Sequence, residues 1–209
     1  MSRPLLITDC DEVLLHMVRH MTAWLDEAHA IDFRPVGGHF AKAARRRSDG
    51  GIVSDMDLWG LLGGFFGTEM GRQTLVPHAR EALERIAEVA DVVVLTNLGE
   101  ESLTGRIDQL ARFGIDHRVI CNGIQAKGEP VARLIEEYKP SVAVFVDDLS
   151  QHHTSVAQAA PEVFRLHMIA EPDIAAEVGP APDAHARIDD WADAVEWVLA
   201  RFRGEPVAA

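Results

Sequence analysis

The chain has 209 residues, of which 47% are hydrophobic and 25% charged, and this is the composition of a globular protein. Its length allows one domain with an insertion, or a main domain with a small second one. The formal net charge of −13 argues against nonspecific nucleic-acid binding, which requires a basic face. No signal peptide and no membrane-length apolar run is visible, so we expect a cytoplasmic protein without nucleic-acid or membrane partners.

The first third of the chain contains one predicted strand and several predicted helices. The apolar run Leu5-Leu6-Ile7 predicts a buried strand that leads into Asp9 and Asp11. Residues 15–30 carry apolar side chains at helical spacing and predict an amphipathic helix. Residues 31–76 contain glycine pairs but no alternating run of β-branched residues, so we expect short helices and loops there.

From residue 77 onward, predicted helices and strands alternate. Pro77 opens a helix that leads to the apolar run 92–95, which is typical of a buried parallel strand. Further strands are predicted at 117–121, 141–146 and 163–169, helices at 101–113, 128–138, 153–159 and 189–202, and a loop at 170–187. Such alternation implies right-handed crossovers and an α/β fold with a parallel sheet covered on both faces.

Polar residues follow several of these strands directly. Asp9 and Asp11 come after the first strand, Thr96 and Asn97 after the second, and the pair Asp147-Asp148 after a later one. The carboxyl ends of parallel strands lie on one edge of a sheet, so these side chains should converge. Carboxylates that converge repel each other unless a cation lies among them, and oxygen ligands indicate a hard divalent ion, Mg²⁺ before Ca²⁺.

A lysine completes this set. Lys127 stands at the start of a predicted helix, where a positive charge opposes the helix dipole, so we interpret it as a functional cation. It can neutralise negative charge as that charge develops, while Thr96 and Asn97 offer a hydroxyl and a backbone N–H to an anion. One carboxylate can act as a nucleophile while a second handles the proton. Together these groups fit phosphoryl transfer to an aspartate.

In order and spacing, four motifs resemble those of the haloacid dehalogenase (HAD) superfamily. They read Asp9-Cys10-Asp11-Glu12-Val13, Val92-Val93-Val94-Leu95-Thr96-Asn97, Ala126-Lys127-Gly128 and Phe145-Val146-Asp147-Asp148. The resemblance implies a Rossmann-like core with strand order 5-4-1-2-3, and a small helical cap inserted after the first strand. The expected core is therefore 1–14 and 77–209, and the expected cap is 15–76.

The same resemblance assigns roles to individual residues. Asp9 would be the nucleophile and Asp11 the general acid/base. Mg²⁺ would be held by Asp9, the backbone carbonyl of Asp11 and Asp148, with Asp147 assisting. The phosphoryl group would be bound by Thr96, Asn97 and Lys127. Family dehalogenases lack the second aspartate, so Asp11 favours a phosphatase. Glu12 departs from the family pattern, in which glycine is usual at this position.

The sequence thus predicts a Mg²⁺-dependent phosphohydrolase acting on a small phosphorylated metabolite. Alternatives are a phosphomutase of the same superfamily and a catalytically silent protein that binds a phosphate ligand. A transition-metal site built from His16, His20, His152 and His153 is not needed, because the carboxylates already account for a cation. We expect the cap to select the substrate, with Arg45, Arg46, Arg47, Trp59 and Phe65 as candidate contacts. The oligomeric state stays open.

Overall fold

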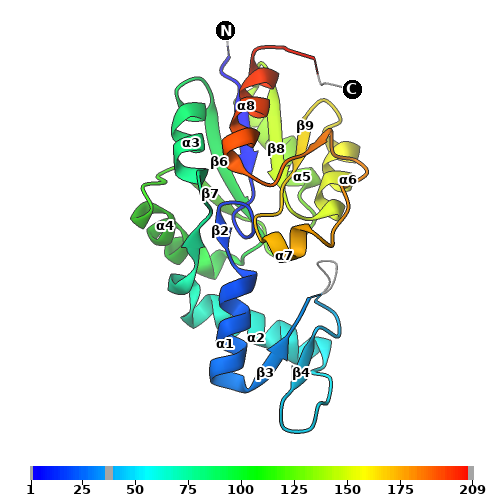
Figure 1. Ribbon diagram of the computed structural model, residues 1–209. Coiled ribbons are helices and arrows are strands. Elements are labelled where there is room, and N and C mark those ends of the chain that lie inside the picture. The colour runs from blue at the N-terminus through cyan, green and yellow to red at the C-terminus, as the bar shows by residue number, and fades with distance from the viewer. Residues whose placement is uncertain (1, 36–39, 207–209) are drawn as a thin grey trace.

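The computed structural model describes residues 2–35 and 40–206, and Figure 1 shows a sheet flanked by helices above a smaller group of elements. Residues 36–39 of the expected cap lie outside the described part of the chain. Among the described helices, none is both long and apolar enough to cross a membrane.

The main sheet has six parallel strands in the described part of the chain, in the order β10-β9-β8-β1-β6-β7. They are β1 (Leu5–Thr8), β6 (Asp91–Thr96), β7 (Arg118–Cys121), β8 (Ala143–Asp147), β9 (Phe164–His167) and β10 (Ala186–Arg187). The predicted order 5-4-1-2-3 is confirmed for five of them. The sixth, β10, adds an edge strand within the segment predicted as loop, because two residues are too few to form a recognisable pattern.

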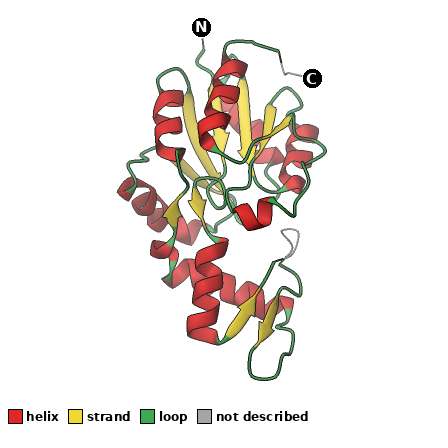
Figure 2. Ribbon diagram, in the orientation of Figure 1, coloured by secondary structure: helices red, strands yellow, loops and turns green. Residues whose placement is uncertain are grey.

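Both faces of the sheet are covered by helices, as Figure 2 shows. Alternate strand residues point to opposite faces. Leu6, Val94 and Val146 pack on the side of α3 (Ala79–Ala87) and α8 (Trp191–Phe202). Leu5, Val93 and Phe145 pack on the side of α5 (Gly128–Tyr138) and α6 (Ser150–Ala159). Burial on both faces explains why these strands read as unbroken apolar runs. The remaining helices of this part are η2 (Glu100–Ser102), α4 (Leu103–Arg112) and α7 (Pro172–Ala175).

The segment between β1 and α3 forms the lower part of Figure 1. Its elements are β2 (Leu15–His16), α1 (Val18–His29), β3 (Ile31–Phe33), β4 (Ala44–Arg46), α2 (Asp55–Thr68), η1 (Met70–Arg72) and β5 (Thr74–Leu75). The segment leaves along β2 and returns along β5, and these two strands pair antiparallel. Trp24, Leu25, Phe33 and Phe65 belong to a hydrophobic cluster that also includes Ile169 and Ile174, so the segment packs against the region around α7.

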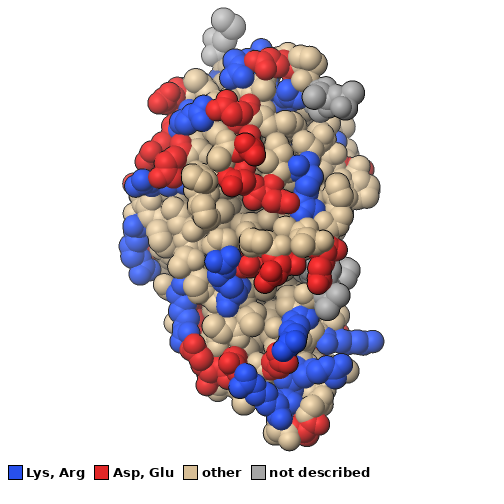
Figure 3. All heavy atoms as spheres, viewed as in Figure 1, with Lys and Arg blue, Asp and Glu red and all other residues tan. Residues whose placement is uncertain are grey.

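The expectation of only short helices and loops in residues 31–76 is wrong for β3 and β4, which form an antiparallel pair. The run Ala44-Arg45-Arg46 lacks an alternating apolar pattern, because only Ala44 in it is buried. Phe65 is fully buried in the cluster, so it cannot contact a substrate. Arg45, Arg46 and Arg47 are exposed at the end farthest from the sheet, where Figure 3 shows several Lys and Arg side chains. Arg46 pairs there with Asp49, and Arg47 with Asp26.

The start of α5 packs so closely on α6 that only glycine fits at position 128. A Cβ atom added to Gly128 would lie 2.3 Å from the carbonyl oxygen of Ser155. We expect Gly128→Ala to lower the free energy of unfolding by about 1–3 kcal/mol, the usual cost of overpacking. Urea denaturation measures this change.

Gly63→Ala is the matched control, because Gly63 lies inside α2 and no atom is within 4 Å of its added Cβ. Alanine there should raise the free energy of unfolding by roughly 0.5–1 kcal/mol through helix propensity. Equal effects of the two substitutions would contradict the close contact at Gly128.

Candidate active site

The motifs singled out in the sequence meet at the carboxyl edge of the main sheet. Strand β1 lies between β6 and β8, with Thr8 opposite both Val94 and Val146. The residues that follow these positions therefore lie side by side: Asp9 after β1, and Thr96 and Asp147 at the ends of β6 and β8. The structure thus brings together the strand-end residues that the sequence singled out.

Lys127 lies at the centre of the site. Its Nζ is 2.7 Å from Oδ1 of Asp9 and 2.7 Å from Oδ2 of Asp147. The lysine and Asp147 side chains are fully buried, and Asp9 is nearly so. Lys127 caps the amino end of α5, whose close packing through Gly128 fixes its position. One ammonium group is therefore shared by two carboxylates inside the protein.

Burial and charge move the pKa values of these groups in different directions. Burial raises the pKa of Asp9 to about 7, although the charge of Lys127 opposes this, and the neighbouring charge of Asp147 adds to it. For Asp147, burial also acts to raise the pKa, but the charge of Lys127 and its hydrogen bond hold it below the ordinary value. Burial, and then the charges of Asp147 and Asp9, raise the pKa of Asp148 well above its ordinary value. Three carboxylates thus lie around one lysine that contacts only two of them, so carboxylates outnumber the neighbouring cation.

This excess charge fits a hard divalent cation. Asp9, Asp147 and Asp148 each offer one oxygen within 4.8 Å of the others. Both oxygens of Asp147 are already engaged, because Oδ2 accepts from Lys127 and Oδ1 accepts from the backbone N–H of Leu149 at 2.9 Å. Asp9 and Asp148 are therefore the better ligands, with Asp147 holding Lys127 in place. Oxygen ligands with this charge suit Mg²⁺.

Two buried histidines support the loop that carries the acidic pair. Nε2 of His153 donates to the carbonyl oxygen of Asp147 at 3.0 Å, and Nε2 of His167 donates to that of Asp148 at 2.8 Å. Burial lowers the pKa of both rings, so they remain neutral near pH 7. Each ring orients a backbone carbonyl and so fixes the direction of the aspartates.

Thr96 at the end of β6 and Asn97 just after it, which the sequence suggested for anion binding, have different surroundings. The Oγ1 of Thr96 is buried and has no hydrogen-bond partner among the described residues, so it is available to a ligand. The side-chain amide of Asn97 instead donates to the carbonyl oxygens of Gly123 at 2.6 Å and Gln125 at 2.8 Å. Asn97 therefore shapes the loop that leads to Lys127, and only its backbone remains for an anion.

Asp11 has partners that the sequence did not indicate. Nη2 of Arg106 lies 2.9 Å from each of its carboxylate oxygens, and Nε2 of Gln73 donates to Oδ1 at 2.6 Å. Arg106 is fully buried, contacts the Cys10 sulfur at 3.2 Å, and lies 5.8 Å from the ring centre of Phe66. A buried guanidinium that donates to both oxygens holds the Asp11 carboxylate in one orientation.

Glu12 occupies a left-handed backbone conformation, with φ of 61°. This conformation costs a non-glycine residue about 1–2 kcal/mol. Its carboxylate accepts hydrogen bonds from the backbone N–H groups of Met17 at 2.7 Å and Val18 at 2.6 Å, at the start of α1. These charge-assisted bonds at a helix N-terminus offset the backbone cost and explain why glutamate is accommodated where glycine would be easiest.

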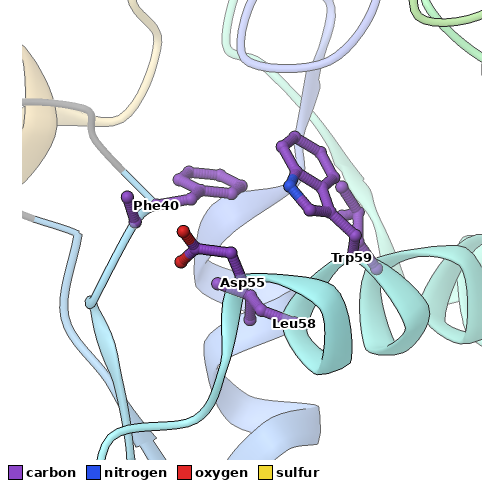
Figure 4. Close-up of a pocket in the computed structure, with 6 residues that line it drawn as sticks. Phe40, Asp55, Leu58 and Trp59 are labelled. Carbon is purple, nitrogen blue, oxygen red and sulfur yellow. The ribbon is translucent and has the colours of Figure 1, made fainter.

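A separate hollow lies on the lower segment. It is lined by Phe40, Ala41, Asp55, Leu58, Trp59 and Leu62. Figure 4 shows the rings of Phe40 and Trp59 on either side of the Asp55 carboxylate. None of its lining residues comes from the sheet edge, so it is not part of the carboxylate site. It does place Trp59, one of the expected substrate contacts, at a concave surface.

Comparisons with known proteins define the fold. No protein-family model matches the chain, and no curated protein matches its sequence. A haloacid dehalogenase-like family hydrolase from Xanthomonas campestris superposes with a TM-score of 0.59 at 14% identity, covering 97% of both chains. A haloacid dehalogenase-like family hydrolase from Streptococcus pneumoniae gives 0.62 at 9% identity, covering 93% of this chain and 97% of the other.

A third structure was determined with ligands. The D,D-heptose 1,7-bisphosphate phosphatase of B. bronchiseptica, complexed with magnesium and phosphate, has a TM-score of 0.56 and 14% identity. The match covers 95% of this chain and 99% of that one. The chain therefore has the fold of the haloacid dehalogenase-like hydrolases, over nearly its whole length.

The pKa of Asp9 predicts how the affinity for Mg²⁺ depends on pH. Protons compete with the metal for the carboxylates, and the pKa of Asp9 is raised to about 7. If Mg²⁺ displaces one proton from Asp9, the affinity for Mg²⁺ should rise by about tenfold per pH unit up to about pH 7 and level off above that pH. Titration calorimetry between pH 5.5 and 8.5 measures this. Asp148→Asn should weaken binding at every pH, and equal wild-type affinity at pH 5.5 and 8 would exclude Asp9 as a ligand.

Proposed function

We propose that this protein is a Mg²⁺-dependent phosphohydrolase of the HAD superfamily that acts on a small phosphorylated metabolite. The observation that carries the proposal is the buried Lys127, placed 2.7 Å from both Asp9 and Asp147 at the carboxyl edge of the sheet. A buried cation among several carboxylates is the arrangement needed to attract and neutralise a phosphoryl group. The shared fold with hydrolases, one of them a phosphatase complexed with magnesium and phosphate, supports this reading.

In the proposed reaction Asp9 attacks phosphorus, so that an Asp9 O–P bond forms and the bond from phosphorus to the leaving oxygen breaks. Lys127 stabilises the charge on the phosphoryl oxygens, and the Thr96 hydroxyl donates a hydrogen bond to one of them. Asp147 keeps Lys127 in position through its 2.7 Å contact. Mg²⁺ held by Asp9 and Asp148 would supply further positive charge. Water then cleaves the aspartyl phosphate and restores Asp9.

Asp11 is the proposed proton carrier. Arg106 and Gln73 donate hydrogen bonds to its carboxylate oxygens. An oxygen that carries a proton accepts such bonds less well, so Asp11 must give up a bond to Arg106 when it carries a proton to a leaving group. We therefore expect substrates with good leaving groups to react most readily.

We further propose that residues 15–76 act as a cap over a core formed by 1–14 and 77–209. Three contacts join the end of this segment to the core: Gln73 to Asp11, Met70 to Gln109, and Phe66 to Arg106. All three lie beside the carboxylate edge. A cap at this place can exclude bulk water and limit the site to small substrates.

A second candidate function is a catalytically silent protein that binds a phosphate ligand. The ion pair between Asp11 and Arg106 favours it, because a binding protein has no use for a free general acid. The two candidates differ in whether Asp9 is needed for turnover, which makes this residue decisive.

The first catalytic prediction concerns Asp9. Asp9→Asn should abolish Mg²⁺-dependent phosphate release from a panel of phosphate esters, because an amide is isosteric but a poor nucleophile. Asp108→Asn, an exposed position on α4, is the control and should retain wild-type rates. Full activity of Asp9→Asn would contradict the mechanism. Absence of turnover in the wild-type protein, together with phosphate binding, would favour the silent binder.

The second prediction concerns Asp11 and the leaving group. Asp11→Asn should lower kcat by about 10²–10⁴-fold for an alkyl phosphate, which needs a proton on its leaving oxygen. The loss should be smaller for an aryl phosphate, whose phenolate leaves without protonation. Steady-state kinetics with a matched pair of esters measures both. If the losses are equal, Asp11 does not protonate the leaving group.

A further inference from the structure

A second cluster of metal-ligand side chains lies beside the catalytic loop, where the chain leaves the core. It consists of Glu12 in the loop after β1, His16 in β2, and Glu171 immediately before α7. Their exposed fractions are 3%, 5% and 8%, so all three are buried. One ligand atom from each lies within 4.8 Å of the other two. The proposed phosphatase mechanism uses none of them.

Two buried polar atoms of this cluster, one from Glu12 and one from His16, lack hydrogen-bond partners among the described residues. Oε1 of Glu12 accepts from the start of α1, but its Oε2 is buried and has no partner among the described residues. Nδ1 of His16 is also buried without a hydrogen bond, at 3.9 Å from Oε2 of Glu171. Leaving such groups unsatisfied costs about 1–3 kcal/mol each. A ligand that fills the centre would remove this cost.

Glu171 is the third side of the cluster. Its two oxygens accept from Arg19, at 2.7 Å from Nε and 3.1 Å from Nη2. Each carboxylate oxygen has two lone pairs, so Oε2 can bind a central ion while the pair with Arg19 persists. Arg19 is about half exposed and lies on the outer side of the carboxylate. The inner side is left with acceptors alone.

The protonation states of the cluster suit a cation. Burial lowers the pKa of His16, as does the charge of Arg19, so its ring is neutral near pH 7 and offers a lone pair. A divalent ion at the centre would pair with the carboxylates of both Glu12 and Glu171.

We propose that Glu12, His16 and Glu171 bind a divalent transition-metal ion, Zn²⁺ or Mn²⁺, at a site separate from the Mg²⁺ site. One imidazole with two carboxylates is a ligand set for Zn²⁺ or Mn²⁺, whereas Mg²⁺ is bound by oxygen alone. Ligands about 2.1 Å from Zn²⁺ are roughly 3.4 Å apart in a tetrahedron, so modest side-chain rotation closes the site.

The position of this site gives it a structural role. His16 belongs to the linker that leads into the lower segment, whereas Glu12 and Glu171 belong to the core side. A bound ion would tie the linker to the loop that carries Asp9 and Asp11. The site goes beyond the proposed phosphatase function and does not depend on it.

The test is a Zn²⁺ titration of the full, metal-stripped chain by calorimetry, in a millimolar excess of Mg²⁺. Wild type should bind one Zn²⁺ tightly, and His16→Asn should bind it at least about tenfold more weakly, because asparagine keeps the shape near Nδ1 but is a poor ligand. The matched control is His20→Asn. His20 lies one helical turn away and contacts Thr74 through Nε2, outside the cluster, so this variant should bind as wild type does.

A thermal readout keeps the test independent of activity. Zn²⁺ should raise the Tm of wild type and of His20→Asn, but not of His16→Asn, because an ion stabilises only the state that binds it. Glu171→Gln should behave as His16→Asn does, which guards against a folding defect in one variant. Equal Zn²⁺ binding by wild type and both cluster variants would overturn the proposal. So would loss of Zn²⁺ binding in Asp148→Asn alone, which would place the ion at the carboxylate edge.

Discussion

The site depends on one buried interaction, in which the Lys127 ammonium is shared between Asp9 and Asp147. Removing charged groups from water costs several kcal/mol per ion, and this cost is recovered only when every charge has partners in good geometry. Lys127 satisfies two carboxylates but leaves Asp148 without a positive neighbour of its own. The resulting excess of negative charge favours a cation at this site, and in the proposed reaction that cation and Lys127 together would offset the charge of the phosphoryl group. Substituting Lys127 alone would leave two buried carboxylates facing each other.

The loop after β1 is held by contacts to several different elements. Arg106 of α4 binds Asp11, Glu12 binds the start of α1, and the indole N–H of Trp191 in α8 donates to the carbonyl oxygen of Val13 at 2.8 Å. Each contact fixes one residue of a loop that has no regular structure of its own. As the proposed nucleophile, Asp9 in this loop would need little reorganisation when it reacts, and such preorganisation is a major source of catalytic power.

The sequence predicted the strand-end residues because buried strands are recognisable as apolar runs, and the carboxyl ends of parallel strands lie on one edge of a sheet. Asp9, Thr96 and Asp147 were found in this way. Arg106 could not be, because it lies within an amphipathic helix among other charged residues, and nothing local marks it as fully buried. Gln73 was missed for a similar reason, since its contact with Asp11 spans 62 positions. Contacts between polar side chains that are far apart in the chain do not produce a periodic pattern in the sequence.

The two linkers of the inserted segment have a mechanical consequence. Because β2 and β5 are hydrogen-bonded to each other, they form a short ribbon instead of two independent tethers. A single tether permits rotation about three axes, whereas a paired ribbon resists shear and twist and bends mainly across its own plane. Any opening of the lower segment is thereby confined to a hinge-like arc. Gln73 follows α2 and directly precedes β5, so movement along that arc would separate it from Asp11. The hydrogen bond that Asp11 accepts from Gln73 is therefore coupled to the angle of the hinge.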